Sequence, residues 1–205
     1  MTSFAPAEHP PALGRDDIHV WFFPEWNVGG RSAESTIVRS LLADYAGADV
    51  AIDYDARGKA HVRGDALHFN LSHSGGALAL AVSRSQSLGI DLEHRRRPRR
   101  VVELARRFFA PHEAEVLETL PEPERQDAFL RLWTRKEALV KAEGSGIAGG
   151  LHRAVFDIDD RGEVAGPRDR SWQVVPFEPA AGFQGAVAWR GAPRSLSYLV
   201  RRIVR

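Results

Sequence analysis

Two acidic side chains at strand spacing are the first candidates for chemistry in this 205-residue chain. Asp91 and Glu93 stand two residues apart in the stretch Gly-Ile-Asp-Leu-Glu. Because side chains alternate faces along an extended strand, both carboxylates are expected to point the same way, with Ile90 and Leu92 packed behind them. Two adjacent carboxylates repel each other, and a divalent cation or a shared proton relieves that repulsion. Ser, His and Lys residues nearby indicate that such a cation would meet a phosphate.

A third acidic residue, Glu137, lies in a stretch whose pattern predicts a helix. Residues 126–140 contain no Gly or Pro, and apolar residues recur there at roughly helical spacing. Trp133, Glu137 and Lys141 are four residues apart, so they line one stripe of that helix. Taken alone, this stretch is interpreted more simply as a buried Trp followed by an ordinary surface Glu–Lys pair. Trp133 itself is expected to pack in the core.

Ser72 and His73 lie in the stretch Asn-Leu-Ser-His-Ser-Gly-Gly at residues 70–76. A nucleophile and its base are not expected here, because adjacent strand residues face opposite ways and the Gly-x-Ser-x-Gly elbow is missing. The alternative is a polar strand end in which Asn70 and Ser72 satisfy backbone groups.

Composition narrows the class of protein. Hydrophobic residues make up 43% and charged residues 27%, which is ordinary for a soluble globular chain of one domain or two closely packed halves. A formal net charge of +1 provides no general attraction for nucleic acid or membrane. The absence of cysteine excludes disulfides, thiol catalysis and Cys-ligated zinc. No apolar run approaches the roughly 20 residues of a membrane span, and no signal peptide is evident, so we expect a cytoplasmic enzyme.

The elements that must position these residues follow from the hydrophobic pattern. Helices are predicted at residues 32–45, 101–109, 112–120 and 126–140. Strands are predicted at residues 18–23, 50–54, 90–93, 154–158, 172–177, 185–189 and 195–200. In the third of these helices, Glu113 and Glu115 are expected at the surface. The part after the glycine-rich residues 144–150 is expected to be mostly sheet and to serve as scaffold.

Together, the three clusters resemble the 4′-phosphopantetheinyl transferase superfamily, in its larger Sfp-like, surfactin-synthetase-activating type. That family's motifs are Phe-Asn-x-Ser-His-Ser, Gly-(Ile/Val)-Asp-x-Glu and Trp-x-x-Lys-Glu-x-x-x-Lys. They stand here in the same order, beginning at Phe69, Gly89 and Trp133. Gly58-Lys59 and the stretch at residues 105–109 are weaker matches, and the resemblance covers about residues 58–147. Shared order and spacing make the combination far more specific than any single motif.

The resemblance implies an α+β protein with the 4′-phosphopantetheinyl transferase fold, in which two similar α/β halves pack with a cleft between them. Residues 1–90 would form the N-terminal, coenzyme A-binding half. Residues 91–205 would form the C-terminal, metal-binding and carrier-facing half. By analogy with the larger type, the protein would be a monomer.

The implied activity is transfer of the 4′-phosphopantetheine group of coenzyme A to a serine of an acyl or peptidyl carrier protein, with release of adenosine 3′,5′-bisphosphate. Carriers of fatty acid, polyketide and nonribosomal peptide biosynthesis all fit, and the sequence does not select among them. Three alternatives remain: a non-catalytic relative that binds coenzyme A or a carrier, an Mg²⁺-dependent phosphohydrolase of coenzyme A, and an interaction domain with solvated acids. All three acids and both lysines of the motifs are present, which argues against a relative that has lost its catalytic activity.

Roles for individual residues also follow from the resemblance. Asp91, Glu93 and Glu137 would hold Mg²⁺. Glu137 is also the candidate base for the acceptor serine. Lys141, and His73 if protonated, would stabilise charge on the pyrophosphate and the leaving group.

Coenzyme A contacts are implied for a set of basic and hydroxyl side chains: Lys59, Ser72, His73, Lys136 and Lys141. For Lys136, a structural ion pair is the open alternative. Arg31 and Arg39 are candidates for binding the 3′-phosphate of the nucleotide. The basic run at residues 94–100 is interpreted first as a solvated loop, and alternatively as a segment that steers acidic carriers toward the site.

Overall fold

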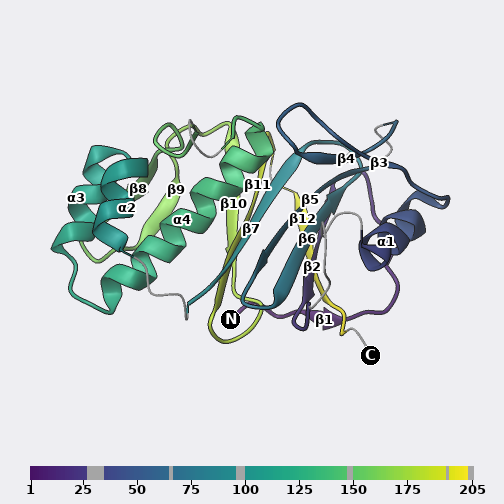
Figure 1. The fold of residues 1–205 in the computed structure, drawn as a ribbon, viewed down its shortest axis with the longest axis horizontal. Coiled ribbons are helices and arrows are strands. Elements are labelled where there is room, and N and C mark those ends of the chain that lie inside the picture. The colour runs from purple at the N-terminus through teal and green to yellow at the C-terminus, as the bar shows by residue number, and fades with distance from the viewer. Residues whose placement is uncertain (27–34, 65–66, 96–99, 147–149, 193, 203–205) are drawn as a thin grey trace.

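Two β-sheets pack against each other in the computed structural model, which describes residues 1–26, 35–64, 67–95, 100–146, 150–192 and 194–202 (Figure 1). The larger sheet has the strand order β1 (Ala5–Pro6), β12 (Ser195–Val200), β2 (Asp17–Phe23), β6 (Ala77–Ser83), β5 (His68–Ser74). The smaller sheet has the order β10 (Trp172–Phe177), β11 (Phe183–Arg190), β7 (Leu88–His94). Two short hairpins are formed by β3 (Ile52–Tyr54) with β4 (Ala60–Val62), and by β8 (Phe156–Ile158) with β9 (Val164–Pro167).

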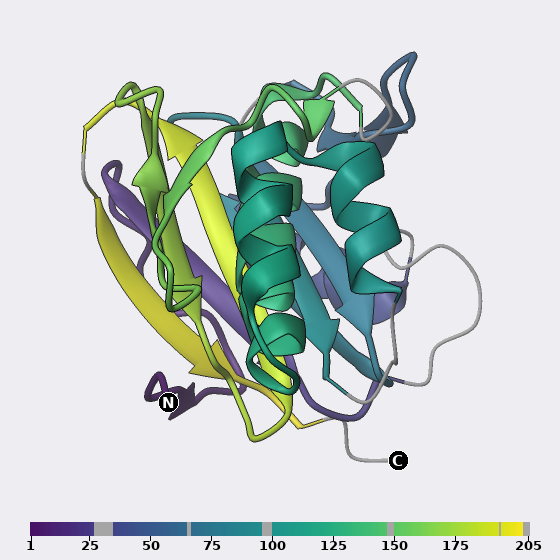
Figure 2. The ribbon, with the colours of Figure 1, turned by 90° about the vertical axis from the view of Figure 1, so that its left-hand side faces the viewer.

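Helices cover the outer faces of both sheets. Helix α1 (Thr36–Ala46) packs on the larger sheet, and α4 (Glu124–Glu143) packs on the smaller one. Helices α2 (Val101–Phe108) and α3 (Pro111–Thr119) lie outside α4 and stand at the front of Figure 2. The mixture of helix and sheet confirms the predicted α+β class.

The chain repeats one arrangement of elements. In the first unit, the strands run β2-β6-β5 across the sheet, and in the second they run β7-β11-β10. In each unit, the first strand is followed along the chain by helical structure, then by a short hairpin, and then by the other two strands of the sheet. The expected division after residue 90 does not follow these units, because β7 spans Leu88–His94 and opens the second unit. In addition, β12 comes from the C-terminal end but pairs with β2 of the larger sheet.

Within the described ranges, three apolar cores hold the layers together. One lies between the two sheets and includes Ile18, Ala79, Ile90 and Val187. The other two lie between each sheet and its helices. Burying both faces of β6 explains why its sequence is an apolar run rather than an alternation.

Helix α4 is longer and more buried than its sequence pattern predicts. It extends from Glu124 to Glu143 and ends at Gly144, whose φ of 72° is the left-handed conformation common after a helix. Three consecutive charged residues, Arg135, Lys136 and Glu137, are buried in its middle. A surface Glu–Lys pair is therefore the wrong interpretation of this helix. Among the described residues, no helix combines the length and apolar character needed to cross a membrane.

Candidate active site

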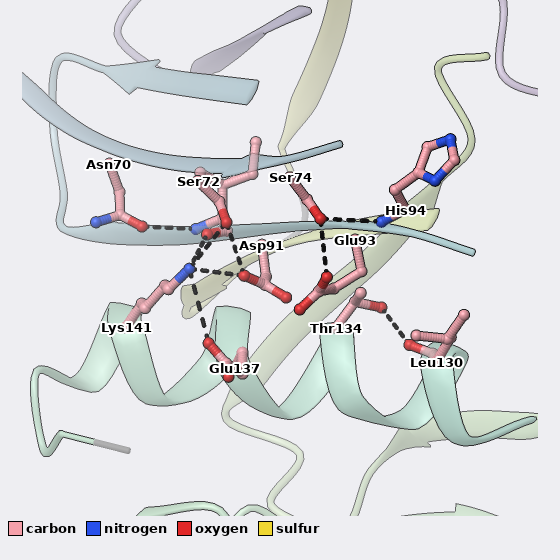
Figure 3. A network of polar contacts seen from close by, with 11 residues as sticks. Asn70, Ser72, Ser74, Asp91, Glu93, His94, Leu130, Thr134, Glu137 and Lys141 are labelled. Atoms are coloured by element: carbon pink, nitrogen blue, oxygen red, sulfur yellow. Dashed lines mark hydrogen bonds and ion pairs between the residues drawn. The ribbon is translucent and has the colours of Figure 1, made fainter. Parts of the chain in front are cut away.

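A row of polar side chains on β5 connects the two sheets at their neighbouring edges (Figure 3). Asn70, Ser72 and Ser74 share one face of β5 because they are two residues apart. The Asn70 side-chain oxygen accepts a hydrogen bond from the Ile90 amide at 2.9 Å. Ser72 and Ser74 donate to the carboxylates of Asp91 at 2.8 Å and Glu93 at 3.0 Å. The first motif therefore orients the acids of the second motif, and Asn70 satisfies a backbone group as predicted.

The acids of β7 face helix α4. Ile90 and Leu92 are buried between the sheets, whereas Asp91 and Glu93 project from the opposite face, as the strand pattern predicts. Across from them, Glu137 and Lys141 project from α4 toward β7 (Figure 3). Asp91 is only 3% exposed.

The ammonium of Lys141 lies at the centre of this group. It donates to Asp91 Oδ1 at 2.7 Å, and to the Ser72 hydroxyl and the Ile90 carbonyl at 3.2 Å each. Glu137 Oε2 lies 3.8 Å from the same nitrogen. Within the described part of the chain, no three acidic or imidazole side chains form a preformed metal cluster. The lysine stands between the acids that were expected to share a cation.

Burial and charge shift the pKa values of this pair. Burial raises the pKa of the Asp91 carboxyl and Glu93 raises it further, while Lys141 and Ser72 oppose the rise. Burial alone would lower the pKa of the Lys141 ammonium, but the carboxylates of Asp91, Glu137 and Glu93 outweigh it and raise that pKa. The site therefore favours a bound positive charge.

Asp91 has one feature that fits a divalent cation. Its second carboxylate oxygen, Oδ2, is buried and has no hydrogen-bond partner. An unsatisfied buried carboxylate oxygen is costly, and oxygen atoms of this type are the ligands that Mg²⁺ prefers. The donor set of Asp91, Glu93 and Glu137 therefore fits an Mg²⁺ ion, with Lys141 close to it.

Gly89 allows helix and strand to approach closely at this point. A β-carbon on Gly89 would overlap the Ala138 carbonyl oxygen and the Ala142 amide nitrogen of α4. Both are backbone atoms of a helix and cannot move aside independently. The glycine of the second motif is thus needed for packing, because it lets α4 bring Glu137 and Lys141 to β7.

A pocket of about 610 Å³ opens beside the β5–β7 junction and is lined by the β3–β4 hairpin and β5. His73 is exposed and lines it together with Lys59. The Lys59 ammonium donates to the Ser87 hydroxyl and to the carbonyls of Leu88 and Lys141. Burial lowers the pKa of Lys59, and Asp55 partly opposes that change. Lys59 therefore connects the hairpin to the C-terminal end of α4, where the helix dipole favours a cation.

Two of the predicted coenzyme contacts have other partners in the structure. The Ser72 hydroxyl is buried and donates its hydrogen bond to Asp91. Lys136 is fully buried and pairs with Glu113 at 2.7 Å, away from the pocket. The structural ion pair is thus the correct alternative for Lys136, because all of its donors are engaged inside the protein. Glu113 is also buried rather than exposed, whereas Glu115 is exposed as predicted.

Among the described residues, the remaining basic candidates Arg39 and Arg95 contact groups other than the acids of the site. Arg39 lies on α1 and lines a different cavity, and its guanidinium reaches the Val50 carbonyl. Arg31 lies outside the described residues. In the basic run, Arg95 lies close to Asp127 and Glu178, and residues 96–99 lie outside the described part. Trp133 packs against the rings of Phe108, Phe109 and Phe129, which confirms its predicted core role.

Residues 87–188 match the model of the 4′-phosphopantetheinyl transferase superfamily. This segment contains β7, α4 and every acid of the site. The chain belongs to that superfamily.

Curated members of the 4′-phosphopantetheinyl transferase superfamily match parts of the chain. The 4′-phosphopantetheinyl transferase HetI of Nostoc sp. is 42% identical over 139 residues, which cover 62% of this chain and 56% of HetI. Sfp of Bacillus subtilis is 37% identical over 98 residues, covering 48% of this chain and 42% of Sfp. AcpT of Salmonella typhi is 44% identical over 93 residues, covering 44% of this chain and 48% of AcpT. The matches thus span about half the length of each relative.

Proposed function

We propose that this protein transfers the 4′-phosphopantetheine group of coenzyme A to a serine hydroxyl of an acyl or peptidyl carrier protein. The observation that carries the proposal is the junction of β7 and α4, where Asp91 accepts a hydrogen bond from Lys141 through Oδ1 and its buried Oδ2 has no hydrogen-bond partner. This junction lies within the segment that matches the superfamily, and the names of the relatives support the same reaction.

The reaction forms a bond between the carrier serine oxygen and the phosphorus that bears the pantetheine arm. The bond from that phosphorus to the bridging oxygen breaks, and adenosine 3′,5′-bisphosphate leaves with the bonding electrons. The serine proton passes to Glu137, directly or through a water molecule. Such transfers depend mainly on positioning and charge neutralisation, which is the chemistry that a dense cluster of charges supplies.

Each residue of the site has a proposed task in this reaction. Asp91, Glu93 and Glu137 would hold Mg²⁺, which when bound neutralises charge on the pyrophosphate. Lys141 stabilises the charge that develops on the leaving group. His73 and Lys59 line the pocket that we assign to the phosphates of coenzyme A.

The test is incubation of the protein with coenzyme A, Mg²⁺ and a panel of apo carrier proteins, followed by intact-protein mass spectrometry. We expect at least one carrier to gain the mass of one phosphopantetheine group. The Asp91→Asn variant, which keeps the side-chain shape and removes the charge, should lower the rate by at least about a hundredfold. A transferase of known activity is run on the same carriers as a positive control. If that control modifies the carriers and this protein leaves all their masses unchanged, the proposal is ruled out.

The same reactions separate two alternatives. A non-catalytic relative would bind coenzyme A in a calorimetric titration but leave every carrier unmodified. An Mg²⁺-dependent phosphohydrolase would release free phosphopantetheine in the reaction without a carrier. Of these outcomes, carrier modification that depends on Asp91 is the one we expect.

A further inference from the structure

Glu113 and Lys136 form an ion pair from which solvent is completely excluded. The Lys136 nitrogen lies 2.7 Å from Glu113 Oε2, and both side chains are 0% exposed. Taking both charges out of water is costly, so such a pair contributes little stability compared with apolar residues of the same size. What a buried pair does require is a defined geometry, because each unsatisfied donor or acceptor would carry a large penalty.

All three donors of the Lys136 ammonium are engaged. Besides Glu113, the nitrogen donates to the Leu151 carbonyl at 2.8 Å and the Ala154 carbonyl at 2.5 Å. It also lies 4.9 Å from the centre of the Phe109 ring. The position of the ammonium is therefore set by the segment that follows α4 and by the end of α2.

The Glu113 carboxylate is held by backbone groups as well. Its Oε2 accepts a hydrogen bond from the Ala110 amide at the start of α3, and its Oε1 accepts one from the Phe156 amide of β8. Both distances are 2.8 Å. The carboxylate is therefore fixed by main-chain atoms of two elements, and Lys136 connects α4 to this fixed point.

Lys136 immediately precedes Glu137, and successive side chains on a helix point about 100° apart. Lys136 points into the layer formed by α3 and the 150–156 segment, whereas Glu137 and Lys141 point toward β7 (Figure 3). A rotation of α4 that moved Lys136 away from its acceptors would also turn Glu137 and Lys141 away from Asp91. On the other side of the helix, the absence of a β-carbon at Gly89 permits close contact but does not select a rotation.

From this geometry we propose that Glu113 and Lys136 are positioning residues, which set the rotation of α4 and so place Glu137 and Lys141 against the acids of β7. The proposal rests on the proposed function, since it assigns the pair a role in forming the Mg²⁺ site. The pair acts through its neighbours and does not touch the substrate.

The test uses the double variant Glu113→Gln/Lys136→Met, because Lys136→Met alone leaves a buried carboxylate without a partner and risks unfolding. Mg²⁺ is titrated calorimetrically into the full chain saturated with coenzyme A, at a temperature well below the melting point. We expect the Mg²⁺ dissociation constant of the double variant to rise by at least about tenfold, as for other residues that orient metal ligands.

Leu132→Ala is the matched control. Leu132 lies one helical turn before Lys136 and is fully buried in the same core, but it carries no polar group. This variant should lower the melting temperature and leave the Mg²⁺ dissociation constant unchanged.

Two results would overturn the positioning role alone: Mg²⁺ affinity of the double variant equal to that of the parent, or an equal loss of affinity in Leu132→Ala. A parent protein that fails to bind Mg²⁺ would instead overturn the proposed function, and the positioning role with it.

Discussion

Lys141 on α4 donates a hydrogen bond to Asp91 on β7 across 2.7 Å, and this contact joins the third motif of the chain to the second. The same ammonium lies 3.8 Å from Glu137, one turn earlier on the helix. The lysine thus compensates the acids in the structure as it stands, which explains how buried carboxylates are tolerated so close together.

Removing this counter-charge should destabilise the protein. In Lys141→Met, the buried Asp91 carboxylate loses its partner, so we expect the free energy of unfolding to fall by about 3 kcal/mol. Added Mg²⁺ should restore more stability to the variant than it adds to the parent, because Asp91 has lost the Lys141 counter-charge. Urea unfolding with and without Mg²⁺ measures both effects.

The control for this variant is Lys141→Met/Asp91→Asn, in which no carboxylate remains unpaired at position 91. Part of the lost stability should return. A single variant as stable as the parent would contradict the role of Lys141 as counter-charge.

Gly89→Ala should separate α4 from β7. The added methyl group meets backbone atoms of Ala138 and Ala142, and overpacking of this kind costs about 1–3 kcal/mol or more. Because Glu137 and Lys141 lie on the displaced helix, phosphopantetheine transfer should fall more steeply than stability does. Thermal unfolding and the carrier mass assay report the two losses separately.

Gly166→Ala provides the comparison, because a β-carbon there meets only the end of the Arg170 side chain, at 3.3 Å. It should change neither stability nor transfer appreciably. If Gly89→Ala behaved in the same way, close approach of the helix would not be required for the site.

His73→Ala tests the assignment of the pocket. His73 is exposed and lines the pocket, so its removal should leave the fold intact and raise the Michaelis constant for coenzyme A. The Michaelis constant for the carrier and the affinity for Mg²⁺ should not change. His61→Ala, at an exposed position on β4 that does not line the pocket, is the matched variant. Equal coenzyme A kinetics in the two variants would argue against a phosphate role for His73.

A histidine far from the acids should make stability depend on pH. His19 is buried, and its Nδ1 lies 2.7 Å from the Tyr45 hydroxyl, which also accepts a hydrogen bond from Trp21. A neutral imidazole has one donor and one acceptor nitrogen, so His19 forms this hydrogen bond with Tyr45 in either tautomer. Burial lowers the pKa of His19 below its ordinary value of 6.5, and Asp17 partly opposes the change.

The sign of the effect follows from proton uptake. Below pH 6.5 the unfolded chain binds a proton that the native protein does not, so stability should fall as the pH decreases from 6.5 toward the native pKa. The loss attributable to His19 is at most about 1.4 kcal/mol per pH unit. Urea unfolding of the parent and of His19→Gln at pH 7.5, 6.5 and 5.5 measures it, and equal slopes would exclude His19 as the source.

Local patterns were sufficient for much of this structure. Alternation along β7 places Asp91 and Glu93 on one face, and strand spacing also puts Asn70, Ser72 and Ser74 together on β5. The helix that carries Glu137 and Lys141 follows from its apolar spacing and its lack of Gly and Pro. These features depend on neighbours within a few residues, so a single sequence contains the information for them.

Tertiary packing alone decided which of these faces meet. No local pattern distinguishes the buried Glu113 and Lys136 from surface residues, because the two lie on separate helices and are buried only when α3 packs on α4. In the same way, β12 joins the larger sheet from the far end of the chain, and the Ser72 hydroxyl serves Asp91 because β5 and β7 lie side by side. Burial of a charge depends on the partner that compensates it, and that partner is brought near by the fold and not by sequence proximity.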